Sequence, residues 1–158
     1  MKRRKIIRIG IIVAVAGIVI AGAVGFYMFN MPHRDVQSAK ADFSLNSSEI
    51  VAEYLTDADA ANNKYLAADG DSKVLEVTGI VSKISDDFDG QKVVLLKSDS
   101  DKAGVSATFT PETNANAEKL LVGESVTVKG VIRAGAAYDS DLELYENVIL
   151  EKSDVVTK

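Results

Sequence analysis

The sequence predicts a mainly β domain, a small five-stranded barrel, that follows one apolar helix near the N-terminus. Three observations lead to this prediction. A stretch with no charged residue runs from Ile9 to Phe29. After residue 73, apolar and polar residues alternate in five short stretches, which is the period of half-buried strands. A short segment with helical character lies between the third and fourth stretches.

The apolar stretch predicts a helix that spans a membrane once. Its 21 residues reach about 32 Å as a helix, and the hydrocarbon core of a bilayer is about 30 Å thick. Pro32 is expected to end the helix. Five basic residues precede the helix: Lys2, Arg3, Arg4, Lys5 and Arg8. After its C-terminal end, Arg34 is the nearest basic residue. We therefore expect the N-terminus in the cytoplasm and the rest of the chain outside the cytoplasmic (inner) membrane.

A cleaved signal peptide is the alternative interpretation of this segment. Residues 21–23, Ala-Gly-Ala, have the small-x-small form of a cleavage site that would end at Ala23. The apolar run continues to Phe29, which favours an uncleaved anchor. Three small residues share one face of this helix and could pack against a second helix: Gly17, Ala21 and Gly25. Such residues are, however, common in membrane helices generally. The oligomeric state stays open.

Composition narrows the function classes. After the basic N-terminal end the chain has 13 basic and 23 acidic residues, and so acidic a domain repels phosphates; nucleic acid is not an expected ligand. There is no cysteine, which excludes disulfides and thiolate catalysis. The single histidine, His33, lies beside the expected membrane. We therefore expect a protein that is not an enzyme, with no catalytic residue and no cofactor.

A helix is expected to precede the barrel. Residues 46–66 place apolar side chains at helical spacing, and Asn46 can cap the helix with Glu49 at the capping-box position. The apolar face of this helix is expected to pack on the β domain. The expected division of the chain is a basic end and anchor, a tether, a folded domain and a polar tail: residues 1–30, 31–45, 46–152 and 153–158.

The strand pattern indicates a particular barrel. Glycines interrupt the first and fourth strands at Gly79 and Gly130, where a glycine indicates a bulge or a tight bend. Residues 113–122 predict a short helix that ends at Gly123. The five expected strands are residues 74–84, 92–97, 105–110, 125–133 and 142–151. This β-β-β-α-β-β order is that of the OB-fold, a five-stranded Greek-key barrel.

Several stretches carry a family resemblance: Tyr65-Leu66, residues 73–81 (KVLEVTGIV), 105–109 (VSATF), 121–130 (LVGESVTVKG) and 146–149 (ENVI). They resemble the bacterial tRNA_anti-like family, small OB-fold proteins that are often membrane-anchored or lipoproteins. The resemblance covers roughly residues 45–150 and implies the fold, with no catalytic residue to transfer. The family name does not imply tRNA binding. This chain lacks the cysteines that some members carry in the third and fifth strands, and residues 67–72 look like an insertion.

OB-folds bind ligands on the face of their second and third strands, between the 1–2 and 4–5 loops. The residues expected there are Phe88, Lys92, Lys97, Ser106, Thr108, Arg133 and Tyr138. We expect a module that binds a peptide, a glycan or another envelope protein. Two alternatives are a calcium or small-ligand sensor and a structural accessory of a membrane complex. No metal ligand is assigned, because the clustered aspartates lie in predicted turns, where they are common for backbone reasons.

Overall fold

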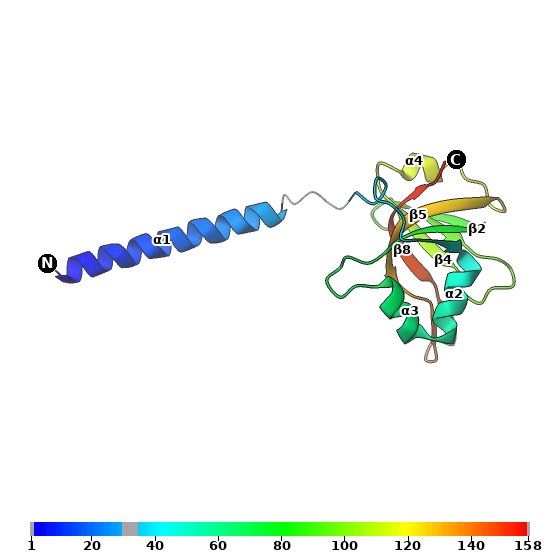
Figure 1. Ribbon diagram of the computed structural model, residues 1–158. Coiled ribbons are helices and arrows are strands. Elements are labelled where there is room, and N and C mark those ends of the chain that lie inside the picture. Colours follow the sequence, from blue (N-terminus) through cyan, green and yellow to red (C-terminus); the bar gives the residue numbers. More distant parts are fainter. Residues whose placement is uncertain (1, 30–34, 158) are drawn as a thin grey trace. The chain divides into compact units, whose positions relative to one another are not determined.

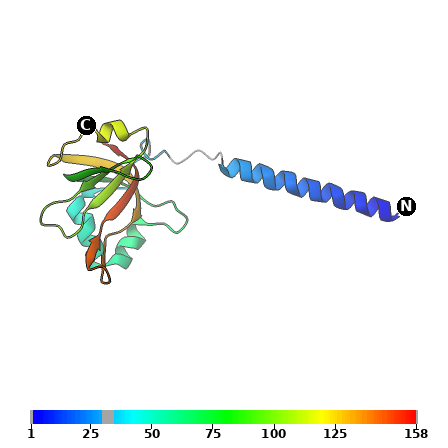
Figure 2. The same ribbon diagram turned by 180° about the vertical axis from the view of Figure 1, so that it is seen from behind.

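The computed structural model describes residues 2–29 and 35–157, in two compact units that divide after Asp35 (Figures 1 and 2). The first unit is the helix α1 (Lys2–Phe29). Its segment Ile12–Phe29 is long and apolar enough to cross a membrane, and none of that segment is buried. The expected helix end at Pro32 and the lone His33 lie outside the described residues.

Five strands of the second unit close into a barrel, shown in Figure 1: β2 (Val74–Asp86), β3 (Lys92–Leu96), β4 (Val105–Phe109), β5 (Ser125–Ala134) and β8 (Val148–Val155). Their order is β2-β3-β4-β8-β5, and β5 pairs back with β2. β4 and β8 are parallel, and the other barrel pairs are antiparallel. This is the OB-fold topology, and the predicted fold class is confirmed.

The expected fifth strand, residues 142–151, begins too early. Residues 137–146 instead form a separate hairpin of β6 (Ala137–Asp139) and β7 (Leu144–Glu146), which pair with each other. Asp139 closes the turn, because its Oδ1 accepts the N–H groups of Asp141 at 2.8 Å and Leu142 at 3.0 Å. Alternation is the same in a hairpin as in a barrel strand, so it does not show where β8 begins. β8 then runs to Val155, into the expected tail.

The expected single helix is two helices, α2 (Ser47–Thr56) and α3 (Ala58–Tyr65). The capping box of Asn46 and Glu49 is present at the start of α2. The break falls at Asp57, whose backbone is extended and whose Oδ1 accepts the N–H of Ala60 at 3.0 Å. Aspartate is a favoured N-cap, so it starts a second helix where the helical period alone predicts continuation.

Residues 36–46 lie in the folded unit and not in a tether. Val36 is buried on the outer side of the barrel against Val74 and Val131. The strand β1 (Phe43–Asn46) then pairs in parallel with β2. An isolated valine among polar residues has no period, so the sequence pattern did not reveal this contact.

Helices close both ends of the barrel. Figure 1 shows α4 (Asn114–Ala117) at one end, and α2 and α3 at the other. α4 is shorter than predicted, yet its Ala117 is fully buried in the main core, where Tyr54 and Tyr65 from α2 and α3 also lie. Gly79 is needed because the Ser47 side chain at the start of α2 occupies the position of its missing Cβ. Gly130 lies at an irregularity between β5 and β8, as expected of a strand glycine.

Candidate functional site

Along β3 and β4, side chains that point into the barrel core alternate with side chains that point outward. Val94, Leu96, Ala107 and Phe109 point inward and are fully buried. Their neighbours are half-buried and face outward, and the register places Val93 beside Thr108 and Leu95 beside Ser106. Ser106 in turn lies beside Ile149 of β8. These outward residues form what we term the β3–β4 face: Val93, Leu95, Ser106, Thr108 and Ile149.

Two projecting segments lie at opposite ends of this face. The loop of residues 87–91 leads into β3, at the end where Val93 pairs with Thr108. The β6–β7 hairpin leads into β8, whose Val148 pairs with Val105 at the start of β4. The expected rim residues are therefore present at both ends: Phe88 is fully exposed in the loop, and Tyr138 is half-exposed on the hairpin.

Tyr145 is a rim residue that the sequence argument missed. Its ring centre lies 4.8 Å from that of Tyr138 across the hairpin. The Nζ of Lys102, from the turn between β3 and β4, lies 5.5 Å from the centre of the same ring, which is cation–π range. The Leu-Tyr-Glu alternation of residues 144–146 predicts a barrel strand equally well, so the sequence alone does not show that Tyr145 lies in the hairpin.

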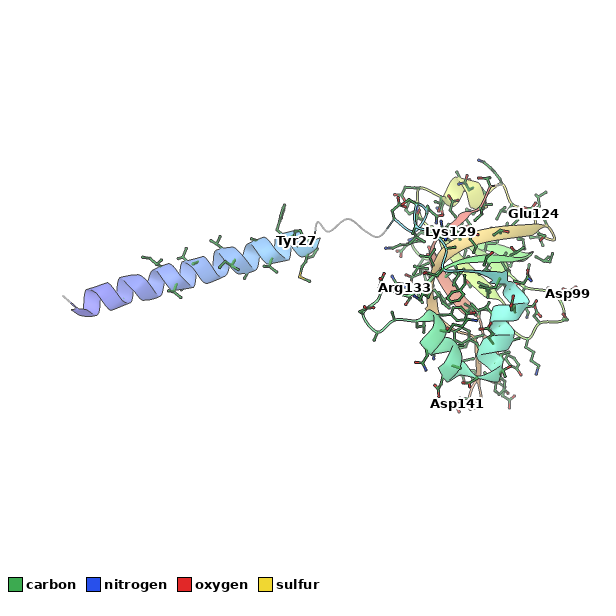
Figure 3. The ribbon with its side chains drawn as sticks, in the orientation of Figure 1. Tyr27, Asp99, Glu124, Lys129, Arg133 and Asp141 are labelled. Carbon is green, nitrogen blue, oxygen red and sulfur yellow. The ribbon has the colours of Figure 1, made fainter. Side chains whose placement is uncertain are left out.

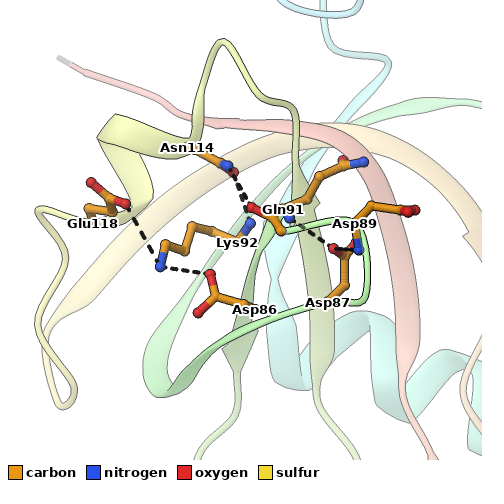
Figure 4. A network of polar contacts seen from close by, with 8 residues as sticks. Asp86, Asp87, Asp89, Gln91, Lys92, Asn114 and Glu118 are labelled. Carbon is orange, nitrogen blue, oxygen red and sulfur yellow. Dashed lines mark hydrogen bonds and ion pairs between the residues drawn. The ribbon is translucent and has the colours of Figure 1, made fainter.

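Lys92 is engaged in a polar network at the other end of the face (Figure 4). Its Nζ lies 2.7 Å from Asp86 Oδ1 and 3.8 Å from Glu118 Oε1, so it joins the β2–β3 hairpin to the segment after α4. These carboxylates, Asp86 first, raise the pKa of Lys92. Its backbone N–H donates to Asn114 Oδ1 at 2.8 Å. The lysine expected to contact ligand therefore already has anionic partners.

The acids of the 87–91 loop organise the turn. Asp87 Oδ1 accepts the N–H groups of Asp89 at 2.9 Å and Gln91 at 2.8 Å (Figure 4). This is the backbone role that makes aspartate common in turns. Across residues 2–29 and 35–157, no group of three or more Asp, Glu or His side chains is arranged to hold a metal ion.

The remaining expected residues also lie around the face. Arg133 Nε lies 2.8 Å from Glu151 Oε2, so this charge is paired as well (Arg133 is labelled in Figure 3). Lys97 is half-buried just after β3, and its N–H donates to Ile80 O at 2.9 Å. Ser106 and Thr108 lie on the face as expected. The apolar members Val93, Leu95 and Ile149 were missed, although alternation with the buried Val94 and Leu96 marks two of them.

The expected helix-packing residues lie on α1. A Cβ added at Gly17 or Gly25 would meet no described atom within 4 Å, and Ala21 is exposed. Packing of this stripe against a second helix stays a prediction.

Comparison with known proteins supports the fold. The family model tRNA_anti-like matches residues 1–141. A solved structure from Klebsiella pneumoniae subsp. pneumoniae MGH 78578, named a "putative nucleic acid-binding lipoprotein", superposes with a TM-score of 0.53 at 19% sequence identity. The match covers 80% of this chain and 100% of that one, and at this identity it shows a shared fold. No curated protein matches the chain.

Proposed function

Since the chain belongs to the tRNA_anti-like family, we propose that it is a binding module without enzymatic activity that holds a protein or peptide segment across the β3–β4 face. The observation that carries this proposal is the face itself. On a closed barrel, Val93, Leu95 and Ile149 point outward and keep part of their surface in contact with solvent. OB-folds use this position for ligands.

The chemistry of the face favours a peptide. Covering its apolar side chains would contribute about 25 cal/mol per Å² of apolar surface removed from water. The hydroxyls of Ser106 and Thr108 can hydrogen-bond to a main chain beside them. A single-stranded nucleic acid would instead need stacking aromatic residues and a basic groove. The five residues of the face include no aromatic side chain, and Lys92 and Arg133 are paired with carboxylates.

A site-specific photocrosslinker tests the position of the ligand. We expect benzoylphenylalanine at Thr108, in the full-length protein in its own cells, to capture a protein. Ser125, an exposed residue at the start of β5, is the matched control on another side of the barrel. Leu95→Lys should reduce the Thr108 crosslink at least tenfold while lowering the Tm only slightly, because Leu95 is half-buried. Equal capture from Ser125 would contradict the proposed face.

Nucleic acid is the competing outcome, because the Klebsiella protein is named for it. With a fluorescent single-stranded oligonucleotide and the full-length protein, we expect no saturable rise in anisotropy at low salt. Binding that weakens steeply with added salt would replace the peptide proposal, because released counterions are the mark of phosphate contacts.

We further propose that α1 anchors the protein in the cytoplasmic membrane, with the N-terminus inside and the barrel outside. The apolar segment Ile12–Phe29 and the basic residues before it support this orientation. The variants Lys2→Cys and Ser100→Cys test this orientation. Because the chain has no cysteine of its own, each variant carries a single cysteine, and the wild type gives the background labelling. A membrane-impermeant maleimide should label Ser100→Cys in intact cells and Lys2→Cys only after lysis.

The same variants separate the anchor from a cleaved signal peptide. An uncleaved anchor keeps the Lys2→Cys label on the full-length band after lysis. Cleavage after Ala23 would remove that label and shorten the chain. Labelling of Lys2→Cys in intact cells would contradict the orientation.

A further inference from the structure

The negative charge of the domain is concentrated in two segments. Residues 46–66 and 135–147, 34 residues in total, contain eight acidic residues and one lysine. The rest of residues 36–158 contains 14 acidic and 11 basic residues. The first segment contains α2 and α3, and the second contains the β6–β7 hairpin. Most of the excess negative charge therefore lies on these three elements.

These two segments are in contact. The ring of Tyr54, on α2, lies so close to Gly135 that a Cβ there has no room, and the adjacent Ala136 is buried. Figure 3 shows Asp141, at the turn of the hairpin, at the same end of the domain as α2 and α3. We term this surface, made of α2, α3 and the β6–β7 hairpin, the acidic end.

A groove of about 480 Å³ runs between α2 and α3. Three alanines line it, Ala52, Ala60 and Ala61, together with three acidic residues and one lysine: Glu49, Glu53, Asp57 and Lys64. Alanine side chains leave room for the backbone of another helix to approach closely. The groove therefore combines an apolar surface with negative charge.

The helices on both sides of the groove are tied together. Glu53 on α2 accepts the Nζ of Lys64 on α3 at 2.9 and 3.0 Å, and it also accepts the hydroxyl of Tyr65 at 2.9 Å. The one lysine of the acidic end is thus neutralised by a neighbour. Asp59, Asp141 and Glu146 have no ion-pair partner among the described residues, so their charges face solvent uncompensated.

We infer that the acidic end docks a basic amphipathic helix of a partner protein. The apolar stripe of that helix would lie on the alanines of the groove, and its flanking lysines or arginines would face the acids. With ten residues, α2 is about 15 Å long, which matches two to three turns of a bound helix. Complementary charge speeds such an encounter and rejects acidic competitors.

Exposed apolar side chains on the hairpin extend the contact surface. Tyr138, Leu142 and Leu144 have exposed fractions of 52%, 67% and 44%. They stand among Asp139, Asp141, Glu143 and Glu146. The hairpin therefore repeats the chemistry of the groove, apolar groups flanked by acids. The hairpin also forms one rim of the β3–β4 face, whereas the groove between α2 and α3 shares no residue with that face, so variants in the groove and on the face distinguish the two proposals.

A synthetic peptide tests the inference on the full-length protein in dodecyl maltoside micelles. The probe is a fluorescein-labelled peptide of about 14 residues, with a Leu/Ala stripe at helical spacing and Lys or Arg on both flanks. Saturable binding above the signal of empty micelles is expected, and added salt should weaken it. Two control peptides, one with Glu in place of Lys and Arg and one with the stripe scrambled, should bind at least tenfold more weakly.

Matched variants then locate the site. Ala60→Arg fills the groove and adds a positive charge, so it should weaken binding at least tenfold. Ala115→Arg, at an exposed alanine of α4, should leave binding unchanged. The triple variant Asp59→Asn/Asp141→Asn/Glu146→Gln should weaken binding about three- to tenfold and flatten its salt dependence. Asp99→Asn is its control on another loop (Figure 3). Circular dichroism must show that each variant is folded.

Three outcomes would overturn the inference. They are no saturable binding at all, equal binding of the Glu-containing peptide, and unchanged affinity in Ala60→Arg. Leu95→Lys separates the two proposals, because it alters only the β3–β4 face. If it abolished binding of the probe, recognition of the probe would belong to the β3–β4 face.

Discussion

Two parts of the outer barrel surface are built from the same apolar residue types but differ in whether another segment of the chain covers them. On β2 and β5, Val74 and Val131 point outward and are buried, because Val36 from the preceding segment lies over them. On β3, Val93 and Leu95 also point outward, and they stay half-buried. Apolar outward residues therefore stabilise the fold where the chain covers them, and they remain available to a ligand where it does not.

Polar contacts made by the residues that follow Val36 hold the covering segment in place. The Gln37 amide nitrogen donates to Lys152 O at 2.7 Å, and Lys129 Nζ donates to Gln37 O at 3.0 Å (Lys129 is labelled in Figure 3). Asp42 accepts the N–H of Val74 at 2.8 Å. We interpret the segment as an integral part of the domain that closes one apolar patch of the barrel.

The largest effect should separate the two surfaces directly. Val131→Asp places a charge in a buried apolar site and should lower the free energy of unfolding by about 3 kcal/mol or more. Val93→Asp, the matched change on the β3–β4 face, should cost less than about 1 kcal/mol, because its carboxylate can stay hydrated. Urea denaturation followed by circular dichroism measures both. Equal losses would show that the two surfaces are equally covered.

A smaller loss of stability should follow from a change at Val36, the residue that covers Val74 and Val131. Val36→Ala removes two buried methyl groups and should cost about 1 to 2 kcal/mol. Val93→Ala, at a half-buried position, should cost roughly half as much, because less surface is returned to water. If Val36→Ala were neutral in urea denaturation, the contact of Val36 with Val74 and Val131 would contribute nothing measurable to stability.

The smallest effect concerns α2, which covers one end of the barrel. The Tyr54 hydroxyl is buried and has no hydrogen-bond partner among the described residues. Tyr54→Phe should therefore leave stability unchanged or raise it by up to about 1 kcal/mol. Tyr65→Phe is the control, because it removes the hydrogen bond to Glu53 and should cost about 1 kcal/mol. A clear loss in Tyr54→Phe would indicate a partner for the hydroxyl, such as a buried water.

Tyr54 also predicts a pH dependence. Burial, with smaller contributions from Tyr65 and Glu53, raises the pKa of Tyr54 to about 12, above the ordinary 10.0. The folded state therefore keeps this proton where the unfolded state loses it, and stability should fall as the pH rises from about 10 to about 12. In thermal melts across this range, Tyr54→Phe should show a shallower decline than the wild type. Identical declines would exclude Tyr54 as a source.

Local patterns predicted much of the fold and part of the site. The apolar run of α1, the capping box at Asn46 and the alternating strands depend on neighbouring residues, so their periods and caps are visible in the chain itself. Phe88 and Tyr138 follow from the strand order, because an OB-fold places those two loops beside its ligand face. The contact of Lys92 with Glu118 and the ion pair of Arg133 with Glu151 did not follow, since these carboxylates come from other segments, whereas Asp86 faces Lys92 within one hairpin.

The sequence by itself thus determined the helix at the N-terminus, the OB topology and the net acidity of the domain. Only the tertiary structure decided that Val36 covers Val74 and Val131, that residues 137–146 leave the barrel, and that the acids of α2, α3 and the hairpin share one end. The physical reason is range: periodicity and capping act over a few residues, whereas coverage, register and charge clustering depend on segments that meet only after folding.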